Sequence, residues 1–173
     1  MMNIILKIKP IIATVIFALF GIYSSIFIVT DWKLSLPLVI FYFILTINTF
    51  FSIKLFTKII DPKNVSQIVI DTILFCLYFL LAYKVDSYFW FSVVILALFI
   101  VAIVKYIFLL NLLQYQDLLN KKIFINSLGT VACILNYLFA AFDYGFQSAW
   151  ALVIVFAVAN IYLLVINPMY RIS

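Results

Sequence analysis

Residues 66–110 read SQIVIDTILFCLYFLLAYKVDSYFWFSVVILALFIVAIVKYIFLL, which is two apolar stretches joined by a short polar turn. The stretches, Ser66–Tyr83 and Tyr88–Leu110, are each close to the length of about 20 residues that a helix needs to cross a hydrocarbon core. Helices satisfy all of their backbone hydrogen bonds internally, as lipid requires. The sequence therefore predicts a membrane hairpin of two antiparallel helices.

The rest of the chain repeats this pattern. Four more apolar stretches lie at Pro10–Thr30, Leu34–Ile53, Ile123–Phe142 and Ser148–Asn167. Hydrophobic residues make up 69% of the chain and charged residues only 10%, which is too little polar surface to cover a soluble domain of this size. We therefore predict an all-α, polytopic transmembrane helical bundle of about six spans in three hairpins, with residues 1–173 forming one transmembrane domain.

Basic residues fall mainly on one side of these spans. The side that holds both termini carries nine of them, namely Lys7, Lys9, Lys54, Lys58, Lys63, Lys105, Lys121, Lys122 and Arg171. The opposite side carries only Lys33 and Lys84. Short cytoplasmic loops hold the excess of Lys and Arg in membrane proteins, so we predict that both termini are cytoplasmic. Such a basic surface suits the anionic lipids of the inner leaflet or an acidic cytosolic protein.

Two charged residues lie inside the spans of the hairpin 66–110. Asp71 is five residues into Ser66–Tyr83, and Lys105 is five residues before the end of Tyr88–Leu110. On antiparallel helices we expect these charges at the same depth, as an intramembrane ion pair. A lone charge in a span costs about 2.5–3.5 kcal/mol, much of which pairing removes. Three roles remain open: a structural clamp, a Lys105 that snorkels to the nearby interface, and a proton- or ion-linked switch.

A polar layer is expected in the same leaflet. It consists of Asn48, Asn126, Ser127 and Asn160, which all lie a few residues from the cytoplasmic ends of their spans. Such side chains can hydrogen-bond across helices, so the layer either locks the bundle or an oligomer, or lines an inner vestibule. We expect the packing role, because the opposite leaflet has no matching continuous polar path.

Small residues are concentrated in the last two spans. Gly129, Ala132, Ala140 and Ala141 lie in the fifth span, and several alanines lie in the sixth. Small residues let membrane helices approach closely. We therefore expect the last hairpin to be the tightly packed one, and the earlier spans to face lipid more.

The only extended polar surfaces are two cytoplasmic connections, Lys54–Asn64 and Asn111–Lys122. The second carries an apolar helical stripe that includes Leu118 and Leu119, so it either lies in the headgroup plane or extends the fourth helix. We predict that these connections bind a soluble partner or lipid. The residues expected to do so are Lys54, Lys58, Lys63, Tyr115, Lys121 and Lys122.

The residue types that are missing restrict the chemistry. The chain has no histidine and no glutamate, which removes the commonest general base and metal ligand. Its three glycines form no phosphate-binding loop. We expect no enzymatic activity, no cofactor, no metal and no direct binding of nucleic acid. Two classes remain: a membrane sensor or docking platform for a cytosolic effector, and a small channel or transporter subunit gated near Asp71 and Lys105.

The opening MMNIILKIKP at residues 1–10, the small size and the Ile-, Phe-, Asn- and Lys-rich composition resemble the membrane subunits of bacterial immunity cassettes. The chain resembles the KwaA family of the Kiwa anti-phage system over its whole length, in layout and composition. The resemblance implies a homo-oligomer in the bacterial inner membrane that recruits a cytosolic, nucleic-acid-binding partner and responds to phage-induced stress on the membrane. It also implies four spans as the alternative to six. Colicin-type immunity proteins are another family of similar size.

Overall fold

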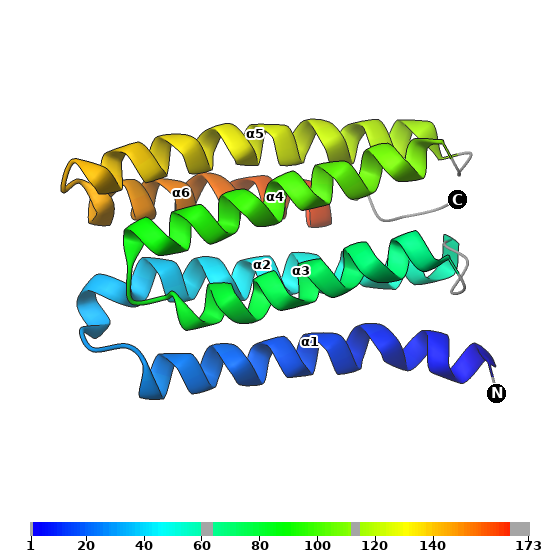
Figure 1. The fold of residues 1–173 in the computed structure, drawn as a ribbon, viewed down its shortest axis with the longest axis horizontal. Coiled ribbons are helices and arrows are strands. Elements are labelled where there is room, and N and C mark those ends of the chain that lie inside the picture. Colours follow the sequence, from blue (N-terminus) through cyan, green and yellow to red (C-terminus); the bar gives the residue numbers. More distant parts are fainter. Residues whose placement is uncertain (1, 60–63, 112–114, 167–173) are drawn as a thin grey trace.

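The computed structural model describes residues 2–59, 64–111 and 115–166, with side chains from Ile8 onward. Six long helices run side by side along the molecule (Figure 1). They are α1 (Met2–Phe27), α2 (Trp32–Ile59), α3 (Val65–Tyr83), α4 (Tyr88–Leu110), α5 (Gln116–Ala141) and α6 (Gly145–Ile161), and a π-helical segment, Tyr162–Ile166, continues α6. These described residues contain no strand. All six helices are long and apolar enough to cross a membrane. The predicted all-α, six-span bundle is confirmed, and the chain is a multi-pass membrane protein.

The helix boundaries agree best with the sequence where a short turn separates two apolar runs. α4 begins at Tyr88 and ends at Leu110, as predicted. The hydroxyl of Ser87 caps its first turn by accepting a hydrogen bond from a backbone N–H at 3.4 Å. This cap replaces an intrahelical partner that the first turn of any helix lacks.

The boundaries differ at the end of the second span. α2 continues to Ile59, six residues beyond the predicted Ile53. Lys54 and Lys58 therefore lie on the last turns of a helix and not on a loop. A hydropathy pattern ends where charged residues begin, but a helix can continue past the hydrocarbon into the headgroup layer.

The connection Asn111–Lys122 is also helical over part of its length. α5 begins at Gln116, seven residues before the predicted Ile123. Its first turn carries Asp117. The negative charge of this residue interacts favourably with the positive end of the helix dipole and stabilises the start of α5. The apolar stripe predicted for this connection is thus divided, and its second half belongs to α5, where Leu119 is buried.

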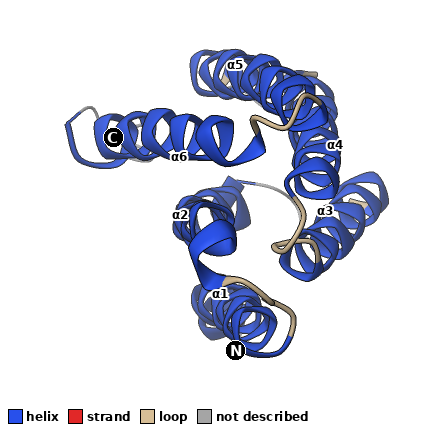
Figure 2. Cartoon of the chain, turned by 90° about the vertical axis from the view of Figure 1, so that its left-hand side faces the viewer, coloured by secondary structure: helices blue, strands red, loops and turns tan. Residues whose placement is uncertain are grey.

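The helices form a ring in the order α1, α2, α6, α5, α4, α3, which closes where α3 packs on α1 (Figure 2). α5 packs most extensively along α4, and less along α6. Gly129 of α5 lies against the ring of Phe99 on α4, because a Cβ at this glycine would be 3.0 Å from that ring. The expectation that the last hairpin would be the tightly packed one is therefore wrong, because the small residues of α5 serve its contact with α4.

The two ends of the bundle differ in charge. We call one end the basic end: it holds the start of α1 and the ends of helices that carry Lys9, Lys54, Lys58 and Lys121. We call the other the turn end, where α1 meets α2, α3 meets α4, and α5 meets α6 (Figure 1). By the positive-inside rule, the basic end is the one expected on the cytoplasmic side.

Hydrogen bonds tie the helices together at the turn end. The carboxylate of Asp86, between α3 and α4, accepts hydrogen bonds from the backbone N–H and hydroxyl of Thr30 and from the hydroxyl of Ser35 at 3.0–3.3 Å. The Tyr88 hydroxyl donates to the backbone carbonyl of Leu34 at 2.5 Å. Large side chains that are almost fully buried lie just beneath, among them Leu38, Phe41, Tyr42, Leu81, Phe91 and Ile95. The turn end is therefore a closed, packed core.

Candidate functional site

A cavity of about 890 Å³ occupies the half of the bundle toward the basic end. All six helices contribute to its wall. Aromatic and aliphatic side chains line its deep part, including Phe17, Phe41, Leu98 and Phe156, whereas charged and amide side chains line the part near the basic end. The volume lies in the range of about 300–1,000 Å³ that is usual for small-molecule sites.

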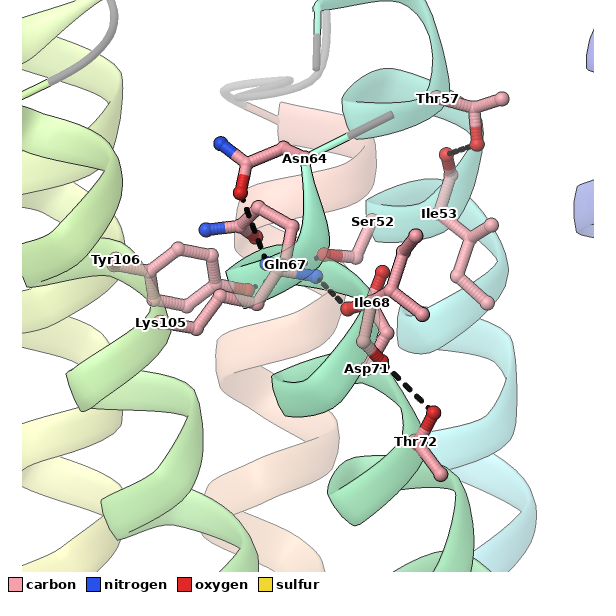
Figure 3. A network of polar contacts seen from close by, with 10 residues as sticks. All are labelled: Ser52, Ile53, Thr57, Asn64, Gln67, Ile68, Asp71, Thr72, Lys105 and Tyr106. Atoms are coloured by element: carbon pink, nitrogen blue, oxygen red, sulfur yellow. Dashed lines mark hydrogen bonds and ion pairs between the residues drawn. The ribbon is translucent and has the colours of Figure 1, made fainter. Parts of the chain in front are cut away.

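The two charged residues of the predicted hairpin 66–110 meet in this wall. Lys105 Nζ on α4 lies 2.5 Å from Asp71 Oδ1 on α3 (Figure 3). The Lys105 side chain is 12% exposed and that of Asp71 is 45% exposed. The carboxylate therefore faces open space on one side while the ammonium group is enclosed. Such an arrangement fits a charged pair on the edge of a cavity, and it is not that of a Lys105 that snorkels away from Asp71.

A second lysine is buried next to this pair. Lys122, on the second turn of α5, is only 4% exposed. Its Nζ lies 5.9 Å from the centre of the Tyr106 ring, and Lys105 Nζ lies 5.7 Å from the centre of the Phe56 ring. The two rings are themselves 5.4 Å apart. The two ammonium groups thus flank one aromatic pair, a position in which ring faces attract cations.

Lys122 was predicted on an exposed cytoplasmic connection, and the structure places it inside the bundle. The predicted location is wrong because α5 begins at Gln116, so residue 122 lies on a helix and not on a connection. In α5, the neighbouring Lys121 is exposed whereas Lys122 faces inward. Successive residues of a helix point about 100° apart, so a Lys-Lys pair at the start of an extended α5 directs one side chain to each side.

Gln67 is a polar residue of the cavity wall that the sequence analysis missed. Its side chain is 2% exposed, and neither its Nε2 nor its Oε1 atom has a hydrogen-bond partner within the described ranges. It lies one turn before Asp71 on α3 and extends toward α4 and Tyr106 (Figure 3). The spacing of four residues from Asp71 was a usable signal, because it places both side chains on one helix face.

Three members of the predicted polar layer, Asn48, Asn126 and Asn160, line the cavity, and Ser127 is outside its wall. Asn126 Nδ2 donates to the carbonyl of Lys122 at 2.6 Å, and Asn160 Nδ2 donates to the carbonyl of Phe156 at 2.7 Å. Both bonds are within a single helix, four residues apart. These two bonds do not join helices, and all three amides lie where an inner vestibule would have its wall.

The remaining residues of the predicted binding face lie around the basic end. Lys54, Lys58 and Lys121 are exposed, and Tyr115, just before α5, is 41% exposed. Lys121 also borders the cavity, together with Lys9. Lys63 lies outside the described residues. The exposed lysines therefore surround the end of the bundle at which the cavity lies.

The side chains of this wall are suited to holding a ligand. Within the described ranges, no three His, Cys, Asp or Glu side chains are grouped so that they could hold a metal ion. Ammonium groups, amides and hydroxyls around a partly apolar cavity can hold a ligand through charge, hydrogen bonds and contact area. Comparisons of the chain with protein-family models, with curated proteins and with solved structures give no match.

Proposed function

We propose that the chain is a non-catalytic membrane sensor. In this proposal a ligand occupies the cavity, and its presence changes the basic end, on which a cytosolic effector docks. The location is the bacterial inner membrane, with both termini in the cytoplasm, as the nine-to-two distribution of basic residues favours.

One observation carries the proposal. The first turns of α5 contribute to the cavity and to the basic surface at once, because Lys122 is buried in the cavity wall while the adjacent Lys121 is exposed. A ligand that moves or orders Lys122 must therefore also affect the exposed side of the same turns. Lys54 and Lys58 extend this surface along the end of α2. The cavity and the docking surface are thus joined by a rigid element.

Homo-oligomerisation and a role in anti-phage defence belong to the same proposal. α5 has the least buried span, with 11% of it buried against 39% for α2 and for α4, so its outer side is where we propose that copies associate. The defence role rests on the resemblance to the KwaA family. It predicts that deletion of the gene in its native host raises the number of phage plaques, and that the wild-type chain restores resistance.

The docking step is tested by extracting the full-length protein in mild detergent and identifying the soluble proteins that remain bound. We expect a stable partner with the wild type and its loss in a variant that combines Lys54→Glu, Lys58→Glu and Lys121→Glu. A variant with Lys33→Glu and Lys84→Glu, at the turn end, is the matched control and should keep the partner. Equal capture by all three proteins would exclude the basic end as the docking surface.

A carrier or channel subunit gated near Asp71 and Lys105 is the second candidate. The observation that favours it is the one-sided closure of the bundle, hollow toward the basic end and packed at the turn end around Asp86. Flux of anions into liposomes that contain only this protein would favour this class. Absence of flux together with a partner that depends on the exposed lysines would favour the sensor.

A further inference from the structure

We propose that the cavity is a binding site for an amphiphile with one acyl chain and an anionic headgroup, either a carboxylate or a phosphate. The headgroup lies near Lys105, Lys122 and Gln67, and the acyl chain extends toward the apolar part of the wall. This inference rests on the proposed function, because it names the class of ligand that the sensor would hold.

The charge of the wall selects an anion. The lining contains Lys9, Lys105, Lys121 and Lys122, and Asp71 is the single acidic residue that the described part of the wall contains, which gives four positive charges against one negative. Two of these lysines are largely enclosed, at 12% exposure for the Lys105 side chain and 4% for Lys122. Buried charge is unfavourable unless it is compensated. The described part of the wall therefore has an excess of basic side chains, which attracts an anion.

The Gln67 amide gives a second and independent indication of a ligand. Buried amides in proteins nearly always have partners, and an exception needs an explanation. Gln67 lies in the cavity wall with both polar side-chain atoms buried and unpartnered by any described residue. Its Nε2 group offers two donors, and a carboxylate or phosphate oxygen is an acceptor for which they are suited. Nε2 would thus complete the headgroup site beside the two ammonium groups.

The rest of the wall requires an apolar part of the ligand. Beyond the charged part the cavity is lined by Phe17, Leu45, Leu98, Phe99, Leu152 and Phe156. A free inorganic anion would leave this region without contacts. An acyl chain would cover it, and the burial of each of its CH₂ groups is favourable. The excess of lysines disfavours a cation, and a neutral lipid would gain nothing from it.

The cavity also reaches the surface that faces lipid. Phe124 and Leu128 on α5 and Val155 on α6 belong to its lining, and each is more than half exposed on the bundle. The site therefore has an apolar border between α5 and α6, in addition to the lysines at the basic end. An amphiphile of the inner leaflet has its headgroup at the depth of Lys121 and its chain at the depth of this border. Entry from the leaflet needs no passage of the chain through water.

The test uses the full-length protein in nanodiscs of phosphatidylcholine, with tritiated hexadecanoate as the probe. Unlabelled hexadecanoate and hexadecyl phosphate should both displace it, and hexadecanol, which has the same chain without charge, should be at least 10-fold weaker. Acetate and inorganic phosphate should not compete at equal concentration. Equal competition by hexadecanol would overturn the anionic headgroup, and strong competition by inorganic phosphate would overturn the acyl chain and indicate a free anion as the ligand.

Variants then locate the site. Lys122→Gln and Gln67→Leu should each weaken hexadecanoate binding at least 10-fold, whereas Lys33→Gln, at the turn end, should leave it unchanged. Ala132→Phe adds a ring to the cavity wall without changing a charge and should also abolish binding. Size-exclusion profiles identify any variant that does not fold. If Lys122→Gln or Gln67→Leu does not fold, the binding measured for Ala132→Phe tests the location of the site. Wild-type affinity in folded Ala132→Phe would overturn the site.

Failure of this inference is distinguishable from failure of the proposed function. If hexadecanoate does not bind while capture of the cytosolic partner still depends on Lys54, Lys58 and Lys121, the ligand class is wrong and the sensor proposal stands. If hexadecanoate binds as expected and the partner is captured equally by all variants, the binding site stands and the docking function is wrong.

Discussion

Asp71 and Lys105 are 34 positions apart in the sequence and 2.5 Å apart in space, joined across the interface of α3 and α4. Both residues line the cavity, and Lys105 is at the same time packed over the Phe56 ring. This relationship makes the pair both a contact between two helices and a source of charge for the site.

The first prediction concerns this pair. Asp71→Asn or Lys105→Gln alone leaves an uncompensated charge, whose cost in a membrane span reaches about 3 kcal/mol, so each should lower the free energy of unfolding. The exchanged pair Asp71→Lys with Lys105→Asp should recover part of that loss. The wild type, the two single variants and the variant that combines Asp71→Asn with Lys105→Gln form a double-mutant cycle, and their unfolding in bicelles gives the coupling. A coupling energy of zero would mean that the two residues act independently.

The second prediction concerns orientation in the membrane. In a background with Cys76→Ala and Cys133→Ala, a cysteine at Ser87 should be labelled by a membrane-impermeant maleimide from outside the cell. A cysteine at Asn120 should be labelled only after the inner face is opened. The reason is the excess of basic residues at the basic end. Labelling of both positions from one side would contradict the arrangement of the six helices.

The third prediction concerns the turn end. Asp86→Ala removes the acceptor of the hydrogen bonds from Thr30 and Ser35, and bonds of this charged type contribute about 1.5–3 kcal/mol when they are well enclosed. Asp86 is exposed, so we expect a modest fall in melting temperature. Partner capture and hexadecanoate binding should not change. Asp143→Asn is the control, because it removes a charge at the same end and asparagine tolerates the positive φ of 64° at this position. An equal fall there would argue against the network.

The fourth prediction compares two glycines within helices. A Cβ at Gly21 would lie 2.6 Å from the Tyr42 ring, and one at Gly129 would lie 3.0 Å from the Phe99 ring. Tyr42 is 1% exposed and its hydroxyl donates to the carbonyl of Phe17 at 2.9 Å, so it cannot move. Phe99 borders the cavity and has space to shift.

Gly21→Ala should therefore destabilise the protein by about 1–3 kcal/mol, the usual effect of overpacking. Gly129→Ala should be close to neutral, because the gain in helix propensity of about 1 kcal/mol offsets a small shift of the ring. Thermal unfolding of both variants in the same detergent gives the comparison. If Gly129→Ala destabilised the protein more than Gly21→Ala, the Phe99 ring would be held more firmly than the Tyr42 ring.

The sequence predicted the helices well and their neighbours poorly. Hydropathy reports the transfer of each segment into lipid, so it located α4 from Tyr88 to Leu110 without error. It carries no information on which helices pack together, because every apolar face is equally suited to lipid. The small residues around Gly129 indicated a close approach, but the partner is Phe99 on α4 and not a residue of α6.

The same limit applies to the site. The depth of Asp71 and Lys105 followed from the length of a hairpin, so a contact between them was predictable. The burial of Lys122 was not predictable, because it depends on where α5 begins. Charged residues near the start of α5 lower the local hydropathy, so a hydropathy pattern does not mark the beginning of this helix. Gln67 was overlooked because a single amide near a helix end is ordinary. Its lack of a partner is visible only when every neighbouring helix is in place.

The contact between Asp71 and Lys105 also bears on how the chain is made. Both residues belong to consecutive helices that are joined by the turn around Lys84 and Asp86, so the pair needs no other part of the bundle in order to form. Each helix alone would bring an unpaired charge into the bilayer as it leaves the translocon. As a hairpin, the two helices can partition together with their charges already neutralised. We therefore expect α3 and α4 to enter the bilayer as one unit, which makes their hairpin the biosynthetic unit of this region.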